Sequence, residues 1–157
     1  MCCAKDEIHG LMTKNREAKK ACFDEFMGDL RGLPPDAFQC ENVMELKKRA
    51  ICVGQCYAQK LGIIDSQGDV NKDGLKDFLK ENLKMDWFEP LIEEVAEKCS
   101  AEANGEQDEE AMCKPNGMKL MHCIFTEVQL RCPDNEIEDK EMCSKLRNFI
   151  IPHMKTD

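Results

Sequence analysis

The chain has 157 residues, with 22 basic and 31 acidic side chains and a formal net charge of −9. This length is typical of one domain, and we expect residues 1–157 to form a single domain. The acidic balance excludes the clustered positive surface that a nucleic acid or an anionic membrane needs, and no apolar run approaches the roughly 20 residues of a membrane span.

The first half of the chain predicts two helices. Apolar residues recur at helical spacing from Ile8 to Phe26, and again from Val43 to Leu61, just before Gly62. Pro34 and Pro35 lie between the two stripes and favour a turn, because a proline disfavours helix at the residue before it. Strand-forming residues are scarce, so we expect no sheet.

The middle of the chain predicts a turn followed by two further helices. The glycines of Gly68–Gly74 favour a turn, and Leu75–Leu83 has the spacing of a short helix. Asp86, with Glu89 three residues later, has the pattern of a helix cap. The segment Ala101–Met112 holds five acidic residues and no basic one, which predicts a solvated loop or a frayed helix end.

The last third predicts two more helices. Gly117–Arg131 is the most apolar helix, and Pro133 should end it. Asn135 with Glu138 has the pattern of the cap of a final helix, which leads into the apolar tail 149–151. The fold class is therefore expected to be all-α, with six or seven short helices. Short helices are marginal alone, so several of them need a cross-link.

The 11 cysteines indicate disulfides and, with them, a secreted protein. Structural zinc usually needs paired C-x2-C motifs, which this sequence lacks, so we expect no metal and no cofactor. The first residues, Met1–Asp6, have no apolar signal segment. We therefore expect a mature form that carries an added Met1.

The order and spacing of the cysteines resemble those of the insect odorant-binding proteins. That family has a long gap, C-x3-C, a gap near forty, and C-x8-C. The matching residues here are Cys22, Cys52, Cys56, Cys99, Cys123 and Cys132. More narrowly, Cys113, Pro133 and Cys143 stand where the Plus-C subgroup has additional cysteines and a proline. The resemblance extends from Cys22 to Cys143.

The resemblance implies an interlocked disulfide framework. It would pair Cys22 with Cys56, Cys52 with Cys123, and Cys99 with Cys132. The cysteines outside this set are Cys2, Cys3, Cys40, Cys113 and Cys143. For these we expect Cys113 to pair with Cys143, and Cys40 with Cys2 or Cys3. Because the total is odd, one of the two N-terminal cysteines would be free or bonded to another chain.

The resemblance also implies a function. It indicates a secreted carrier that binds and solubilises small hydrophobic ligands, such as odorants or pheromone-like molecules, in sensillum lymph or a similar fluid. The helices would surround a hydrophobic cavity. The expected partner is a small apolar ligand, with an olfactory receptor involved indirectly, and the carrier would be a monomer or a homodimer.

Two alternatives come from other classes of protein. One is a secreted interaction protein with a filled core and no ligand cavity. The other is a small secreted hydrolase, which needs a nucleophile or a metal beside a base. We find no such group of residues in the sequence, and we expect the protein not to be an enzyme.

The ligand site is expected beside the apolar helix 117–131, whose stripe is wider than a single buried seam requires. Plain helix core is the alternative interpretation of this stripe. Its methionines suit a pocket that accepts ligands of several shapes. The predicted ligand-binding residues are Phe78, Leu79, Leu83, Trp87, Met118, Met121, Ile124, Phe125, Val128, Phe149 and Ile151.

Two further motifs favour structural interpretations. Asp69–Gly74 is similar to the start of a calcium-binding EF loop, but position twelve of that loop would be Lys80 instead of a bidentate acid, so we predict a polar turn. The histidine before Cys123 is similar to that of secreted phospholipases, whose following Asp and glycine-rich calcium loop are missing here. We expect His9, His122 and His153 to lie at the solvent edge, with pH sensing as the alternative.

Overall fold

The computed structural model describes residues 1–30, 43–104 and 111–154, with the side chains of Met12 and of residues 152–154 left aside. Within these ranges the chain forms seven α-helices and three short 3-10 helices, which confirms the all-α class. The α-helices are α1 (Lys5–Thr13), α2 (Arg16–Met27), α3 (Val43–Lys60), α4 (Lys72–Asn82), α5 (Ile92–Ala103), α6 (Asn116–Arg131) and α7 (Lys140–Met154). Among the described residues, each helix is too short or too polar to cross a membrane.

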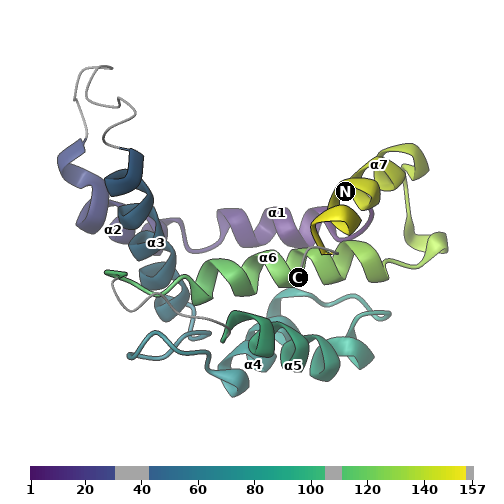
Figure 1. Ribbon diagram of the computed structural model, residues 1–157. Helices are drawn as coiled ribbons and strands as arrows, with labels where there is room; N and C mark the ends of the chain where they lie inside the picture. Colours follow the sequence, from purple (N-terminus) through teal and green to yellow (C-terminus); the bar gives the residue numbers. More distant parts are fainter. Residues whose placement is uncertain (31–42, 105–110, 155–157) are drawn as a thin grey trace.

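Helix α6 is the central element of the fold (Figure 1). Helix α1 lies along one side of it, and α4 and α5 lie along the opposite side. The pair α2 and α3 packs at the end where α6 begins, whereas α7 lies at the end where α6 stops (Figure 1). The most apolar predicted helix is therefore the central one, in contact with α3, α5 and α7.

The stripe from Ile8 to Phe26 forms two helices, so the prediction of one helix is wrong. Helix α1 ends at Thr13 and α2 begins at Arg16. Between them, Asn15 has a φ of 65°, in the left-handed region that asparagine tolerates better than most residues. The break lets α1 lie along α6 while α2 packs against α3.

Two predicted helix caps are also wrong. Asp86 lies in a turn, and α5 begins only at Ile92, after a 3-10 helix that contains Pro90. A proline disfavours the α conformation at the residue before it, which delays the helix. Asn135 lies in a separate 3-10 helix, and the extended residue Ile137 follows it. The N-terminus of α7 is capped instead by Asp139, whose Oδ1 accepts a hydrogen bond from the N–H of Met142 at 3.0 Å.

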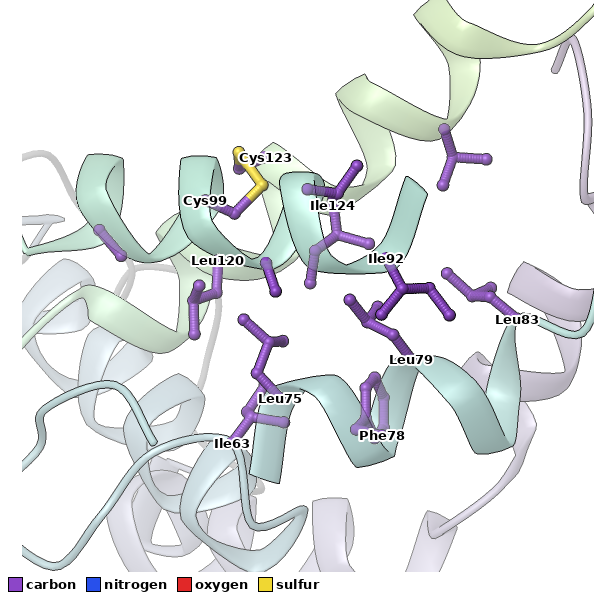
Figure 2. Packing of buried hydrophobic residues seen from close by; sticks show 14 of the residues in the cluster. Ile63, Leu75, Phe78, Leu79, Leu83, Ile92, Cys99, Leu120, Cys123 and Ile124 are labelled. Carbon is purple, nitrogen blue, oxygen red and sulfur yellow. A yellow bond between two sulfur atoms is a disulfide. The ribbon is translucent and has the colours of Figure 1, made fainter. Parts of the chain in front are cut away.

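The largest core cluster lies between α4, α5 and α6 (Figure 2). Leu75 and Leu79 of α4, Ile92 of α5 and Leu120 of α6 are all buried in it. Helix α3 reaches the same cluster through Ala58, which meets α6 at Gly117. A Cβ atom added at Gly117 would lie 2.6 Å from the Cβ of Ala58, so only glycine allows this close approach.

Five disulfides join ten cysteines, and only one of the predicted pairs is among them, Cys22–Cys56 between α2 and α3. The other predicted pairs are wrong. The structure pairs Cys2 with Cys143, Cys3 with Cys132, Cys52 with Cys113, and Cys99 with Cys123. Both N-terminal cysteines are bonded within the chain, contrary to expectation. Cys40 lies outside the described residues.

The position of each cysteine along α6 explains these pairs. Cys52 of α3 lies near the start of α6, where Cys113 is close, whereas Cys123 lies six residues beyond Gly117, roughly 9 Å further along the helix axis. Cys99 of α5 lies beside Cys123 (Figure 2). The interlocked order of the expected framework is kept, but for a different set of six cysteines: Cys22, Cys52, Cys56, Cys99, Cys113 and Cys123. Within this set the first pairs with the third, the second with the fifth, and the fourth with the sixth. Cys113 and Cys123, which form a C-x9-C motif, are thus the fifth and sixth cysteines of the framework, where we expected Cys123 and Cys132 of the C-x8-C motif.

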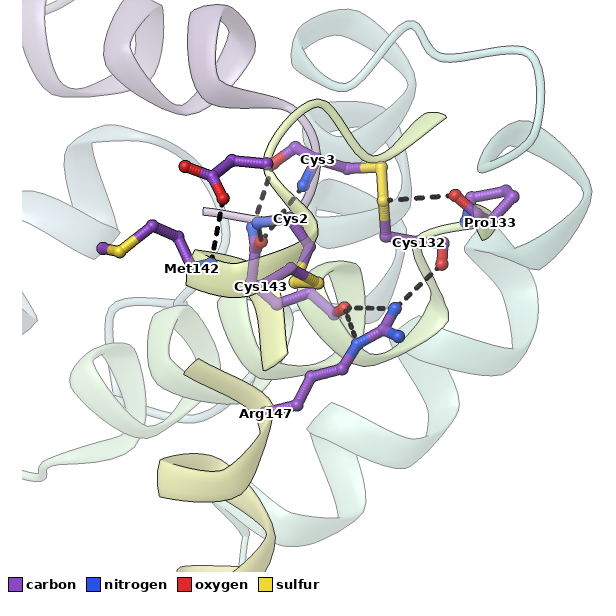
Figure 3. The surroundings of a disulfide bond; sticks show 9 residues. Cys2, Cys3, Cys132, Pro133, Met142, Cys143 and Arg147 are labelled. Carbon is purple, nitrogen blue, oxygen red and sulfur yellow. Dashed lines mark hydrogen bonds between the residues drawn. A yellow bond between two sulfur atoms is a disulfide. The ribbon is translucent and has the colours of Figure 1, made fainter. Parts of the chain in front are cut away.

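The remaining two disulfides tie the N-terminus to the far end of α6 and to α7 (Figure 3). The buried side chain of Gln129 reinforces this junction: it accepts hydrogen bonds from the backbone N–H groups of Cys2 and Cys3 and donates one to the carbonyl of Cys3. The guanidinium of Arg147 donates to the carbonyls of Gln129 and Cys132. These bonds fix the residues from which α1 starts.

Candidate ligand-binding site

An apolar pocket lies between α1 and α6 and is closed by α2, α3 and α4. It encloses about 90 Å³. Ten of its lining residues are apolar or aromatic, and the eleventh is a lysine. The lining residues are Ile8, Leu11, Lys19, Tyr57, Leu61, Phe78, Leu83, Met121, Ile124, Phe125 and Val128.

Six of the predicted ligand-binding residues line this pocket. Helix α6 contributes four of them, because residues three and four apart share one face of a helix. The other two come from α4 and from the residue after it. The six are Phe78, Leu83, Met121, Ile124, Phe125 and Val128. The apolar stripe of α6 thus serves both the pocket and the core, since Ile124 and Val128 also belong to the buried cluster.

The other five predicted residues lie outside the pocket wall. Leu79 is fully buried in the core, and Trp87 packs edge-to-face on Phe88 with the ring centroids 5.6 Å apart. Met118 is half exposed and lies against α3 at Gly54. On α7, Phe149 is 68% exposed, and Ile151 borders a polar surface groove. Of the apolar tail, only Ile150 is buried.

Five pocket residues were not among the predicted ligand-binding residues. Four of them belong to the apolar stripes of the first two predicted helices: Ile8, Leu11, Tyr57 and Leu61. Their helical spacing indicated buried faces, but it could not show that these faces border a cavity. Lys19 gave no signal, because a lysine in a helix is ordinarily exposed to solvent.

Lys19 and Tyr57 are the two lining residues with polar groups in their side chains. The Nζ of Lys19 lies 5.1 Å from the centroid of the Tyr57 ring, within the range of a cation–π contact. Both side chains are half-buried. Burial raises the pKa of the Tyr57 phenol, so its hydroxyl keeps its proton at neutral pH and can donate a hydrogen bond.

Helix α6 also carries a buried carboxylate that does not line the pocket. Glu127 is 3% exposed and accepts hydrogen bonds from Lys98 of α5 and from Arg131. Burial favours the neutral acid, but these two cations outweigh it and hold the pKa of Glu127 below its ordinary value. Arg131 also contacts Glu94 at 3.1 Å, so the network joins α5 to α6. Its role is structural, since every member has a partner.

The segment similar to an EF loop forms hydrogen bonds and an ion pair of its own. Asp69 Oδ1 lies 2.9 Å from the ammonium of Lys114, and Asn71 caps α4 by accepting from the N–H of Gly74. The predicted turn over this segment is only partly right. Val70 forms an isolated bridge with Ile64, and residues 72–74 are already the first turn of α4, which starts earlier than expected, at Lys72. In the described part of the chain, no three His, Cys, Asp or Glu side chains lie close enough together to hold a metal ion. His9 and His122 are exposed, as predicted, and the side chain of His153 lies outside the described part.

Comparison with known proteins decides the family. The profile of the PBP/GOBP family, the insect odorant-binding proteins, matches residues 9–115, which is more than half of the chain. The chain belongs to the PBP/GOBP family. No curated protein and no solved structure matches it. Membership makes this chain a carrier of odorants or pheromones and places it among non-enzymatic proteins.

The pocket agrees with this membership. A carrier needs an apolar enclosure in which the ligand loses contact with water, worth about 25 cal/mol for each Å² of apolar surface removed. The PBP/GOBP chain offers such a wall, built from helices that its disulfides hold together. All four cysteines of the two disulfides that hold the N-terminus lie outside the matched range 9–115, two before it and two after it.

Proposed function

We propose that the pocket between α1 and α6 is where this PBP/GOBP protein binds its hydrophobic ligand. The observation that carries the proposal is the lining itself, with aromatic and aliphatic side chains from five helices or their ends converging on one space. Ligand sites in proteins have this character, mostly apolar with a few placed polar groups. The binding force is the removal of apolar surface from water on both sides.

The size of the pocket sets a condition on binding. At about 90 Å³ it is smaller than the ~150 Å³ cavity that holds a benzene molecule in a protein core. An odorant of ten carbons must therefore displace part of the wall. Met121 is suited to such a change, because methionine has three rotatable bonds. Ile8 and Leu11 are the other suitable wall residues, since α1 is a separate short helix between two residues of positive φ, Ala4 and Asn15.

We also propose that this protein belongs to the Plus-C subgroup and that residues 1–157 form a single domain. We propose further that it is secreted into sensillum lymph or a similar fluid. Four cysteines outside the interlocked six form two additional disulfides, and Pro133 follows one of these cysteines. These support the subgroup. The disulfide between Cys2 and Cys143 of α7 joins residues 141 positions apart in the chain, which supports one domain. We further propose that the carrier acts as a monomer or homodimer and delivers its ligand to an olfactory receptor.

A pair of phenylalanine variants tests the site. The probe is N-phenylnaphthylamine, whose fluorescence rises in an apolar site. Phe125→Ala removes a ring from the pocket wall and should weaken probe binding about tenfold, because a buried aromatic ring provides a large apolar contact. Phe149→Ala makes the same change on α7, where the ring is 68% exposed, and should leave binding unchanged.

Stability is measured on the same two variants by urea unfolding. A loss of several kcal/mol in Phe125→Ala with unchanged affinity per folded molecule would assign this residue to the core and contradict the pocket. Absence of saturable probe binding in the natural sequence would favour the alternative of an interaction protein without a ligand cavity.

A further inference from the structure

The lining of the pocket includes one charged side chain, that of Lys19, which an ideal hydrocarbon site would lack. We propose that the ligand is amphipathic, with an apolar chain in the pocket and a carboxylate head that pairs with Lys19. This inference rests on the pocket being the ligand site, as proposed above. The class is that of medium-length carboxylic acids, as opposed to neutral alcohols, esters or hydrocarbons.

The position of Lys19 is the first step. It is the fourth residue of α2 and one of the residues that line the pocket. A lysine on a helix surface normally extends its ammonium into water. Here the Nζ lies over the ring of Tyr57, 5.1 Å from its centroid, and Tyr57 itself lines the pocket. The cation–π contact therefore holds the charge at the wall of the apolar space.

The local charge is the second step. The chain as a whole is acidic, with a net charge of −9, yet the start of α2 carries Arg16, Lys19 and Lys20 with Glu17 as the acidic residue among them. The N-terminal end of a helix also carries partial positive charge. The first five residues of α2 thus carry a net charge of +2, whereas its second half carries the acidic residues Asp24 and Glu25. A local excess of positive charge at the start of α2 favours an anion near Lys19.

The energy of a charged head is the third step. Transfer of a carboxylate from water into an apolar pocket is costly unless a partner compensates for the lost hydration. A hydrogen bond between an ammonium and a carboxylate is roughly twice as strong as one between neutral groups. Tyr57, which also lines the pocket, carries a protonated hydroxyl that is a second possible donor. An acid should therefore bind better than the matching alcohol when Lys19 is present, and worse when it is absent.

The test compares decanoic acid, methyl decanoate and decanol as displacers of N-phenylnaphthylamine at neutral pH. With the natural sequence, the acid should bind about tenfold more tightly than decanol. Lys19→Met keeps the aliphatic stem and removes the charge, so it should weaken binding of the acid far more than binding of decanol and reverse this order. Lys19→Arg should keep the preference for the acid.

Lys20→Met is the matched control. It removes the same charge from the next residue, which is exposed and does not line the pocket, and the preference for the acid should persist. Equal binding of acid and decanol by the natural sequence, or a parallel change for both ligands in Lys19→Met, would overturn the inference and leave the pocket in place. Failure of all three ligands to displace the probe would overturn the pocket itself, and the inference with it.

Discussion

The side-chain oxygen of Gln129 lies 2.6 Å from the backbone nitrogen of Cys2, 127 residues earlier in the chain. This bond, with two disulfides beside it, joins the first residues of the protein to the last turn of α6. Because α1 follows directly and contributes Ile8 and Leu11 to the pocket, the same junction positions one wall of the proposed ligand site.

Gln129→Leu should lower the free energy of unfolding by about 1–3 kcal/mol. Leucine fills a similar volume but leaves the N–H groups of Cys2 and Cys3 and the carbonyl of Cys3 unpaired, and unpaired buried groups carry a cost of this size. Urea unfolding measures the change. The exposed residue Gln67 provides the control, since Gln67→Leu should stay within about 0.5 kcal/mol. Equal effects of the two substitutions would show that the junction does not need the amide.

Gly117→Ala should destabilise the protein by about 1–3 kcal/mol, the usual cost of overpacking a core. The added methyl group would lie 2.6 Å from the Cβ of Ala58 and 3.1 Å from the carbonyl of Gly54, so α3 and α6 must separate. Gly10→Ala is the matched control on α1, where nothing lies within 4 Å of the new atom. It should be neutral or stabilising, since alanine favours helix over glycine. Thermal unfolding of both variants decides the matter, and a neutral Gly117→Ala would contradict the close packing.

Glu127→Gln should destabilise the protein by about 1–3 kcal/mol at pH 7, because hydrogen bonds to a charged group are stronger than neutral ones. The pKa of Glu127 is lowered in the fold, so the unfolded chain takes up this proton first as the pH falls. The stabilisation is complete above the ordinary glutamate pKa of about 4.3 and is lost as the pH drops through the folded value. The difference between variant and natural sequence should therefore shrink in acid.

Urea unfolding at neutral and acidic pH tests this. Glu141→Gln is the control, since Glu141 is 81% exposed and pairs with Lys145 on the surface of α7. It should change stability by less than about 1 kcal/mol at either pH. A difference for Glu127→Gln that stays constant with pH would rule out titration of this carboxyl as its cause.

Thr126→Val should stabilise the protein by about 1 kcal/mol. The hydroxyl of Thr126 is buried and has no hydrogen-bond partner among the described residues, and a buried hydroxyl without a partner costs free energy. Valine has the same shape without the polar atom. The midpoint of urea unfolding should rise, with an unchanged slope. A lower midpoint would indicate that the hydroxyl has a partner, such as a bound water.

Peptide mapping without reduction should recover Cys52 linked to Cys113 and Cys99 linked to Cys123. These two links separate the structure from the framework expected from C-x8-C, in which Cys52 pairs with Cys123. A fragment that joins Cys52 to Cys123 would overturn the arrangement of α3 against the start of α6.

The local patterns of the sequence determined the helical class, the extent of α3 and α6, and the family. Period and spacing suffice for these, because the apolar face of a helix and the order of cysteines are properties of short segments. Six of the pocket residues were predicted in the same way, since Met121, Ile124, Phe125 and Val128 share a face of α6 that had to be buried somewhere.

Only the tertiary structure decided the disulfide partners and the rest of the pocket. Which sulfur meets Cys52 depends on where α3 crosses α6, and that crossing is set by the contact of Ala58 with Gly117. The break at Asn15 is a local event with a non-local result, because it turns α1 along α6 and α2 toward α3. This change of direction at Asn15 brings Lys19 of α2 to the wall of the pocket, next to residues of α1. The sequence pattern around Lys19 does not predict that position, because it depends on how the two helices pack.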